Sequence, residues 1–149
     1  MATNMKTECH RPPFDGRFIK RFSNLAAEVF DDIDMGSLEW RLSSMPDVTV
    51  FIVADDGRDL GFKAGYAATE NRYYSWLGGV TPTARGRGVA DALMQAQHTW
   101  VKDAGFERVE THVREDNTAM VSLNRKAGLD VVGRFIKAGK PNLMMQKVF

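Results

Sequence analysis

Residues 80–90 read VTPTARGRGVA and form the most informative segment of the chain. The pattern predicts the end of a strand, a short turn and a helix whose first turn has almost no side chains. The N-terminus of a helix offers unpaired backbone N–H groups and the positive end of the helix dipole. Gly86 and Gly88 let a ligand approach this backbone, and Arg85 and Arg87 can add charge-assisted hydrogen bonds to phosphate oxygens. The segment therefore predicts a phosphate-binding turn.

The spacing of this turn resembles the signature Arg/Gln-x-x-Gly-x-Gly/Ala of the GNAT superfamily, the acyl-CoA-dependent N-acyltransferases. Arg85, Gly88 and Ala90 match the signature, and Val80 precedes it at the usual distance. Asn117, followed by LNRKAGL at residues 123–129, resembles the next helix of that family. The resemblance covers roughly residues 48–149 and extends more weakly to the helices before them.

This resemblance implies a fold, a co-substrate and a reaction. The implied fold is mixed α/β (α+β), with a central twisted mixed sheet that is splayed near its middle and has helices on both faces. The implied reaction is N-acetyl transfer from acetyl-CoA by direct attack of a primary amine on the thioester. The turn would hold the pyrophosphate, and the backbone of Val80 would bind the cofactor arm. The residues expected at the cofactor are Val80, Arg85, Gly86, Arg87, Gly88, Val89, Ala90, Asn117 and Asn124.

Length and composition indicate a single domain, residues 1–149, with 44% apolar and 26% charged residues as in ordinary soluble proteins. The formal net charge of +1 predicts no general attraction to nucleic acid or to a membrane surface. Cys9 is the only cysteine, and the chain has neither a signal peptide nor a long apolar segment, so we expect a cytoplasmic protein. His10, His98 and His112 show no ligand pairing, so no metal is expected.

Hydrophobic periodicity predicts helices interleaved with strands. Asp15 is expected to cap a first helix that ends at Gly36, and Ser37 to begin a second helix. Residues 1–13 are expected to form an edge strand or a loosely held arm. The other expected helices span 89–104 and 117–127, and the expected strands span 48–54, 60–68, 73–80, 108–113, 130–136 and 143–148, the first two joined by an Asp55-Asp56-Gly57 turn.

Gly78 and Gly79 interrupt the predicted strand before the phosphate turn. They indicate either a bulge, which the resemblance implies at the thioester site, or close packing beneath Trp76 or Trp100. A backbone N–H near Gly79-Val80 would then polarise the thioester carbonyl.

The catalytic base is open, because a lysine-like amine is neutral in only roughly one molecule in a thousand at pH 7. Some members of the family carry a glutamate at the position that is Tyr74 in this chain, which leaves Tyr74, His112 and Glu110 as candidates. Many members carry a tyrosine that protonates the departing thiolate, and the matching residue is Asn124. The general acid is therefore also open.

The acceptor is expected to be a small-molecule amine or a peptide. Tyr73, Trp76 and Trp40 are expected either to line an apolar acceptor pocket or to belong to the core. The family resemblance also implies a possible homodimer, to which residues 143–145 could contribute. Acidic residues at the junction of the first two helices form either a rim that favours a cationic amine or a solvated surface; they are Glu28, Asp31, Asp32, Asp34 and Glu39.

Other functions fit the sequence less well than acetyl transfer. A Rossmann dinucleotide site is disfavoured because Asp91 occupies the third glycine position of the G-x-G-x-x-G pattern. The chain has no P-loop or hydrolase motif. A non-enzymatic acyl-CoA-binding module and an acetyltransferase acting on a protein N-terminus or lysine remain as alternatives.

Overall fold

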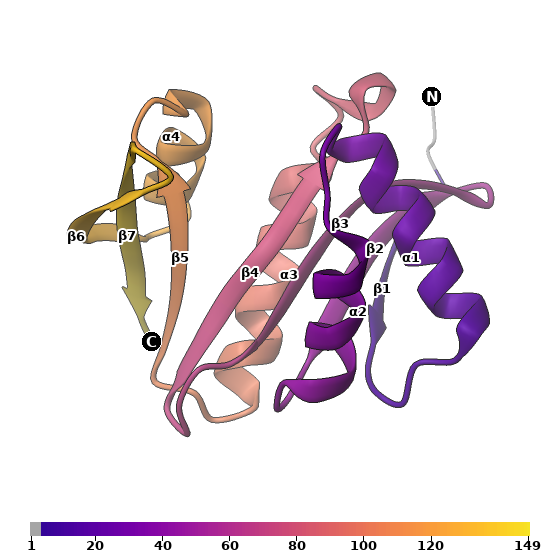
Figure 1. Ribbon diagram of the computed structural model, residues 1–149, viewed down its shortest axis with the longest axis horizontal. Coiled ribbons are helices and arrows are strands. Elements are labelled where there is room, and N and C mark those ends of the chain that lie inside the picture. The colour runs from indigo at the N-terminus through magenta and orange to yellow at the C-terminus, as the bar shows by residue number, and fades with distance from the viewer. Residues whose placement is uncertain (1–3) are drawn as a thin grey trace.

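The computed structural model describes residues 4–149, which contain a seven-stranded sheet in the order β1-β2-β3-β4-β5-β7-β6 (Figure 1). Only the β4–β5 pair is parallel. The strands are β1 (Met5–His10), β2 (Thr49–Asp55), β3 (Arg58–Ala67), β4 (Arg72–Val80), β5 (Arg108–Arg114), β6 (Asp130–Lys137) and β7 (Lys140–Val148). The helices are α1 (Gly16–Val29), α2 (Met35–Ser44), α3 (Val89–Asp103) and α4 (Thr118–Lys126), and the 3-10 turn η1 (Pro82–Ala84) precedes α3.

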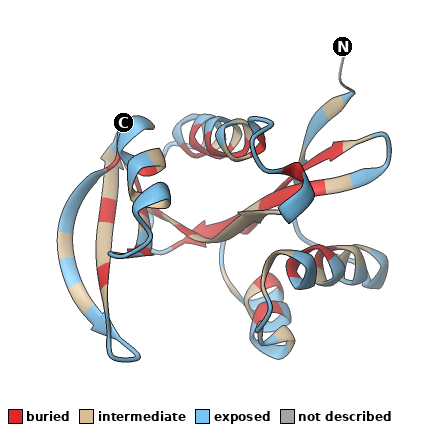
Figure 2. Ribbon diagram, turned by 90° about the horizontal axis from the view of Figure 1, so that it is seen from above, coloured by how far each residue is buried: buried red, intermediate tan, exposed pale blue. Residues whose placement is uncertain are grey.

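Helices cover both faces of the sheet (Figure 2). On one face, Phe22 of α1 and Leu38 of α2 pack on Phe62 of β3. On the other face, α3 packs on β2 and β3, and α4 packs with α3 around Met145 of β7. Apolar burial on both faces is the main force that holds these layers together. The predicted mixed α+β fold with helices on both faces is confirmed.

Strands β4 and β5 pair over only half of their lengths. Arg72–Ser75 of β4 lies opposite Arg108–Thr111 of β5, and beyond this point the two strands diverge (Figure 1). The predicted splay near the middle of the sheet is therefore present. It leaves the last residues of β4 without a strand partner on that edge.

The bulge in β4 lies at Trp76 rather than at the glycines. Ala64 of β3 is opposite Leu77 and the next residue is opposite Ser75, so Trp76 is the extra residue. The prediction of a bulge at Gly78-Gly79 is wrong, because both glycines are paired with β3.

Gly79 is a packing glycine, although its partner differs from the expected tryptophans. A Cβ atom on Gly79 would overlap the Val29 side chain at the end of α1. A Cβ atom on Gly78 would lie 3.4 Å from the Cγ of Lys63. The two glycines therefore make room for α1 on one face of β4 and for a lysine on the other.

The helix ends follow from capping side chains. The Asp15 carboxylate accepts a hydrogen bond of 2.8 Å from the backbone of Phe18, as predicted. The first helix ends at Val29 and not at Gly36, because Asp34 caps α2 through the N–H of Ser37 at 3.1 Å. The N-cap Asp34, three residues before the expected start at Ser37, thus places Gly36 inside α2.

The structure agrees with the expected edge strand and with the expected turn between β2 and β3. Residues Met5–His10 form the edge strand β1, antiparallel to β2. Asp56 and Gly57 both have positive φ (49° and 80°), which matches the twist of a two-residue hairpin turn.

The apolar segment at residues 143–145 lies in an interior strand. Strand β7 is hydrogen-bonded to β5 on one side and β6 on the other, and Met145 is fully buried in the core. Core packing therefore accounts for this segment without a second chain. No helix in residues 4–149 is long and apolar enough to cross a membrane.

Candidate functional site

A cavity of about 680 Å³ lies where β4 and β5 separate. Its wall is formed by the end of α1, by β3, β4 and β5, by the N-terminal part of α3 and by one side of α4. Lys63, Arg85 and Arg114 line it, whereas no Asp or Glu of residues 4–149 does. The cavity is therefore positively charged, as an anionic ligand requires. The predicted site residues in its wall are Val80, Arg85, Ala90, His112, Asn117 and Asn124.

The phosphate turn presents backbone N–H groups at the start of α3. Gly88 is the N-cap in a left-handed conformation (φ 79°), and no side chain caps this helix end. The first helical hydrogen bond runs from the Ala92 N–H to the Gly88 carbonyl, at 3.1 Å. The N–H groups of the three residues between them are therefore unpaired within the helix. Val89 contributes only its backbone, because its side chain is buried.

The two arginines of the turn have different surroundings. The Arg87 guanidinium forms an ion pair of 2.7 Å with Asp55 at the end of β2. Arg85 lines the cavity, and no acidic residue of the described chain pairs with it. Arg85 is therefore the guanidinium that is available to a phosphate group in the cavity.

The free edge of β4 presents the backbone of Val80 to the cavity. The N–H of Thr81 donates to the Leu60 carbonyl of β3 at 2.8 Å. Because successive N–H groups of a strand point to opposite edges, the N–H of Val80 faces the gap and that of Gly79 faces β3. Of the two positions considered for a carbonyl-polarising N–H, the geometry therefore favours Val80.

Helix α4 brings two asparagines to the opposite wall. The Asn117 Oδ1 caps the helix by accepting from the N–H of Met120 at 3.2 Å, which leaves its Nδ2 for a ligand. Asn124 is buried, and its Nδ2 contacts only the Met145 sulfur, at 3.7 Å. A sulfur is a weak acceptor, so a carbonyl of a cofactor arm would be a better partner for this amide.

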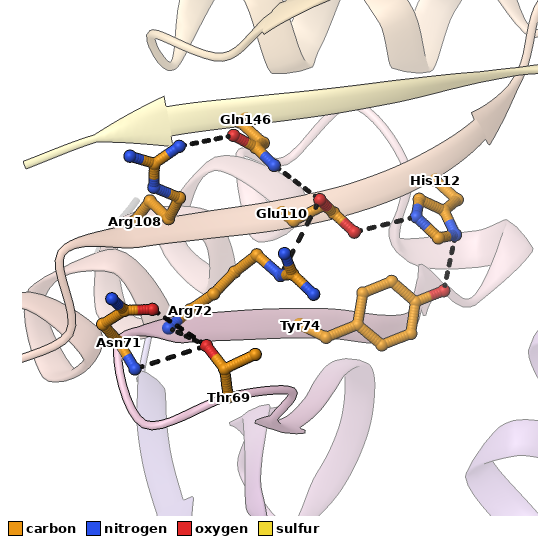
Figure 3. Close-up of polar contacts among 8 residues, drawn as sticks. All are labelled: Thr69, Asn71, Arg72, Tyr74, Arg108, Glu110, His112 and Gln146. Carbon is orange, nitrogen blue, oxygen red and sulfur yellow. Dashed lines mark hydrogen bonds and ion pairs between the residues drawn. The ribbon is translucent and has the colours of Figure 1, made fainter. Parts of the chain in front are cut away.

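Three side chains from neighbouring strands, Tyr74, Glu110 and His112, contact one another (Figure 3). The parallel register places Tyr74 of β4 opposite Glu110 of β5, with His112 two residues further along. His112 contacts Glu110 through Nε2 at 3.0 Å and the Tyr74 hydroxyl through Nδ1 at 3.3 Å. The structure thus brings the three catalytic candidates together. Of the three, His112 lines the cavity, whereas Tyr74 and Glu110 do not.

Two neighbouring side chains hold the Glu110 carboxyl group in place. Gln146 of β7 donates to it at 2.6 Å, and Arg72 lies 4.0 Å away (Figure 3). Arg108 donates to the Gln146 oxygen at 3.1 Å, which fixes the orientation of that amide. We assign the proton on His112 to Nε2, where it is donated to Glu110, so that Nδ1 has the free lone pair. Burial raises the pKa of Tyr74 to about 12, so its hydroxyl stays protonated and donates to Nδ1.

The structure distinguishes between the alternatives for the acceptor-side residues. Tyr73 is fully buried on the α3 face, where its hydroxyl contacts Thr49, so it cannot line an acceptor pocket. Trp40 is 60% exposed and lies outside the cavity wall, whereas Trp76 lines it. None of the five acidic residues near the first helices lines the cavity, and Asp34 is used as a helix cap.

A polar cluster that the sequence did not predict lies beneath β3 and β4. Lys63 lines the cavity, and burial lowers its pKa to about 8. Gln97 and His98 of α3 are buried nearby, and neither polar atom of the Gln97 side chain has a partner in residues 4–149. A lysine in the middle of the apolar strand Leu60–Ala67 is the sequence signal that could have revealed this cluster.

No group of three or more His, Cys, Asp or Glu side chains in the described residues is arranged to hold a metal ion.

Comparisons with known proteins agree with this geometry. The L-2,4-diaminobutyric acid acetyltransferase of Nocardia farcinica (strain IFM 10152) is 35% identical over 77 residues, which is 50% of this chain and 40% of that protein. The chain therefore matches less than half of that relative's length. The ribosomal-protein-S18-alanine N-acetyltransferase of Escherichia coli has a TM-score of 0.81 and 11% identity, over 96% of this chain and 94% of that one.

A GNAT family acetyltransferase from Elizabethkingia anophelis, solved with acetyl-CoA bound, has a TM-score of 0.75 and 10% identity, over 98% of this chain and 99% of that one. At these identities the two structures show a shared fold. The sequence model of the Acetyltransferase (GNAT) family matches residues 14–129, which is most of the chain. The chain therefore belongs to the GNAT acetyltransferase family.

Proposed function

We propose that this protein is an N-acetyltransferase that binds acetyl-CoA between β4 and β5 and transfers the acetyl group to a primary amine. The observation that carries the proposal is the cavity itself. It is cationic, and its wall includes Arg85, Ala90 in the first turn of α3, and His112. The acetyl-CoA-bound neighbour from E. anophelis has the same fold, which supports this choice of co-substrate. Residues 1–149 would act as one domain.

Each part of the cavity has a proposed role in binding. Arg85 and the backbone of residues 86–90 hold the pyrophosphate, with Arg87 contributing mainly to the shape of the turn. Asn117 and Asn124 bind the polar groups of the cofactor arm. The N–H of Val80 donates to the thioester oxygen, where negative charge develops during attack.

His112 is proposed as the general base. The acceptor enters as an ammonium ion and gives one proton to His112 Nδ1, after displacing the long hydrogen bond from Tyr74. Glu110 stabilises the imidazolium that results, and Gln146 and Arg72 keep Glu110 in position. The neutral nitrogen then attacks the thioester carbon. Tyr74 and Glu110 act as positioning groups, because each contacts His112 and neither lines the cavity.

A small amine is the proposed acceptor. The relative that shares 35% identity is named for a small diamino acid, whereas the neighbour named for an alanine of ribosomal protein S18 shares only the fold. A peptide N-terminus or lysine remains the alternative acceptor. The Tyr74–His112–Glu110 contacts favour an enzyme over a non-catalytic binding module, because such a module would not need an oriented base.

The test is release of coenzyme A thiol from acetyl-CoA in the presence of L-2,4-diaminobutyrate and a panel of small amines. We expect turnover with at least one amine, and a loss of about 100-fold or more in kcat/KM for His112→Ala, because general base catalysis is typically worth that much. The same variant should also change the pH profile. His10→Ala is the matched control, since His10 lies on β1 away from the cavity.

The outcomes separate the alternatives. Turnover with alanine-initiated or lysine peptides alone would identify a protein acceptor. Binding of acetyl-CoA without thiol release for any amine or peptide would indicate a binding module. An unchanged rate and pH profile in His112→Ala would remove His112 from the mechanism.

A further inference from the structure

We propose that Lys63 is the general acid that protonates the departing coenzyme A thiolate, in place of the tyrosine that this chain replaces with Asn124. The inference rests on the proposed function, because it requires the thioester to lie between β4 and β5. It assigns the proton donor that the family pattern leaves vacant in this sequence.

The register of β3 and β4 directs Lys63 toward the cavity. Lys63 is paired with Gly78, so its side chain lies on the same face of the sheet as the missing side chain of Gly78. A Cβ atom on Gly78 would come within 3.4 Å of the Lys63 Cγ, and glycine therefore leaves space for the lysine stem under β4. Lys63 lines the same cavity as Val80 and Asn124, between which the sulfur would lie.

Lys63 has no anionic partner in residues 4–149. It forms no ion pair in these residues, and His98 on α3 is close enough for the Lys63 charge to affect its pKa. The other charged or titratable side chains in the cavity wall are Arg85, His112 and Arg114, and Arg114 is paired with Asp116 outside the wall. No carboxylate of the described residues lies in the wall. The pKa of His98 is lowered to about 4, mainly by burial and then by the charges of Lys63 and Lys147, so His98 stays neutral. An anion formed in the cavity is therefore the available partner for Lys63.

The acidity of Lys63 suits this task. Burial lowers its pKa to about 8, so most molecules carry the ammonium form at pH 7. An ordinary thiol has a pKa of about 8.5, and proton transfer between groups of similar pKa is nearly balanced in energy. An exposed lysine, with a pKa of about 10.4, would hold its proton more tightly than the thiolate does.

The neutral acceptor nitrogen forms a bond to the thioester carbon, and the carbon–sulfur bond breaks with its electron pair on sulfur. Sulfur takes a proton from the Lys63 Nζ and leaves as the coenzyme A thiol. The nitrogen gives up one proton as the amide forms, which restores the Lys63 ammonium, and His112 releases its proton to solvent.

The test uses coenzyme A and desulfo-coenzyme A, which has hydrogen in place of the thiol, and needs no acceptor. Isothermal titration gives the ratio of their two Kd values from about pH 6 to about pH 9.5, a range that spans the thiol and lysine pKa values. The phosphates are identical, so their contribution cancels in the ratio. We expect the preference for coenzyme A to rise about tenfold toward pH 8, as the thiolate pairs with the Lys63 ammonium, and to fall above this pH as Lys63 loses its proton.

Variants of Lys63 make the assignment specific. Lys63→Met should abolish the pH-dependent preference below about pH 8 while both nucleotides still bind. Lys63→Arg should keep the preference without the decline at high pH, since arginine stays charged. Lys102→Met, an exposed position on α3, is the matched control and should behave as the parent does.

The results distinguish this inference from the proposed function. If neither nucleotide binds the parent protein, the proposed function fails and the role of Lys63 fails with it. If both nucleotides bind and the ratio of their Kd values does not change with pH, only the assignment of Lys63 is overturned. The same holds if the preference for coenzyme A still rises toward pH 8 in Lys63→Met.

Discussion

Single residues decide how the cavity divides its positive charge. Arg85 and Arg87 are two positions apart in sequence, yet Arg87 is tied to Asp55 and Arg85 lines the cavity. A guanidinium that already has a carboxylate partner gains less from a phosphate, because it must share or exchange that partner. The two arginines therefore differ in function although the motif treats them alike.

Removal of Arg85 should weaken acetyl-CoA binding selectively. We expect Arg85→Ala to raise the Kd about tenfold, since a hydrogen bond to a charged group contributes about 1.5 kcal/mol or more. Arg87→Ala should change the Kd by less than about threefold, because it removes a partly exposed surface ion pair. Isothermal titration measures both. Equal effects of the two variants would contradict the assignment of Arg85 as the phosphate ligand.

Lys63 should lower the stability of the protein below pH 8. Its pKa is about 8 in the folded state and about 10.5 in the unfolded state, so the ammonium disfavours folding. Lys63→Met should therefore raise the free energy of unfolding at pH 7 by about 2 kcal/mol, allowing for the part of the side chain that reaches the cavity. This advantage should shrink as the pH rises from 8 to 10.5, because the folded parent then loses the unfavourable charge first. Urea titrations at both ends of this range measure it, and a variant less stable than the parent at pH 7 would contradict it.

Sequence spacing could predict the residue types of the site more readily than their partners. The turn at residues 80–90 pointed to Arg85 and Arg87 equally, because the acid that neutralises Arg87 comes from a strand 32 residues earlier. The sequence did not predict Lys63 as a site residue, because the space for its side chain depends on Gly78 in the neighbouring strand. The pairing of these two residues cannot be read from a short segment of sequence.

At the level of the elements, the site depends on strands that stop pairing. The cavity exists because β4 and β5 separate after Ser75, and α1 covers the free part of β4. The end of α1 approaches β4 so closely at Gly79 that a side chain would not fit. The cavity wall and the packing of α1 are therefore linked through one glycine.

Gly79→Ala should destabilise the protein by about 1–3 kcal/mol, the usual effect of overpacking a core contact. Val29→Ala in the same chain should recover most of this loss, because it removes the atoms that the new methyl group meets. Urea unfolding of the four proteins of this double-mutant cycle measures the coupling. Additive effects of the two substitutions would contradict the contact.

Local signals predicted most elements, and failures arose where two signals competed. Asp15 as a cap and Asp56-Gly57 as a turn were predicted correctly, because each acts within a few residues. Gly36 is typical of a helix end, but the carboxylate of Asp34 caps α2, and Gly36 therefore lies inside that helix. The meeting of Tyr74, His112 and Glu110 could be expected from strand alternation only once β4 and β5 were known to be parallel neighbours.

For the whole molecule, the predicted family is confirmed, because the GNAT family model matches most of the chain. The net charge of +1 hides an uneven distribution, because no acidic residue of the described chain lines a cavity that contains a lysine and two arginines. The overall charge therefore carries no information about the charge of the local site. The acceptor and the catalytic roles stay predictions, because they depend on groups that act only together with bound substrates.

Hydrogen–deuterium exchange with and without acetyl-CoA tests whether the cofactor lies between β4 and β5. At about 100 times the Kd, where the site is nearly saturated, we expect slower exchange in peptides that cover residues 77–91 and 117–124. Strand β1 and helix α2 should exchange at unchanged rates, because neither contributes to the cavity wall. Absence of any change, or protection confined to elements outside these two segments, would contradict the proposed site and the acetyltransferase mechanism built on it.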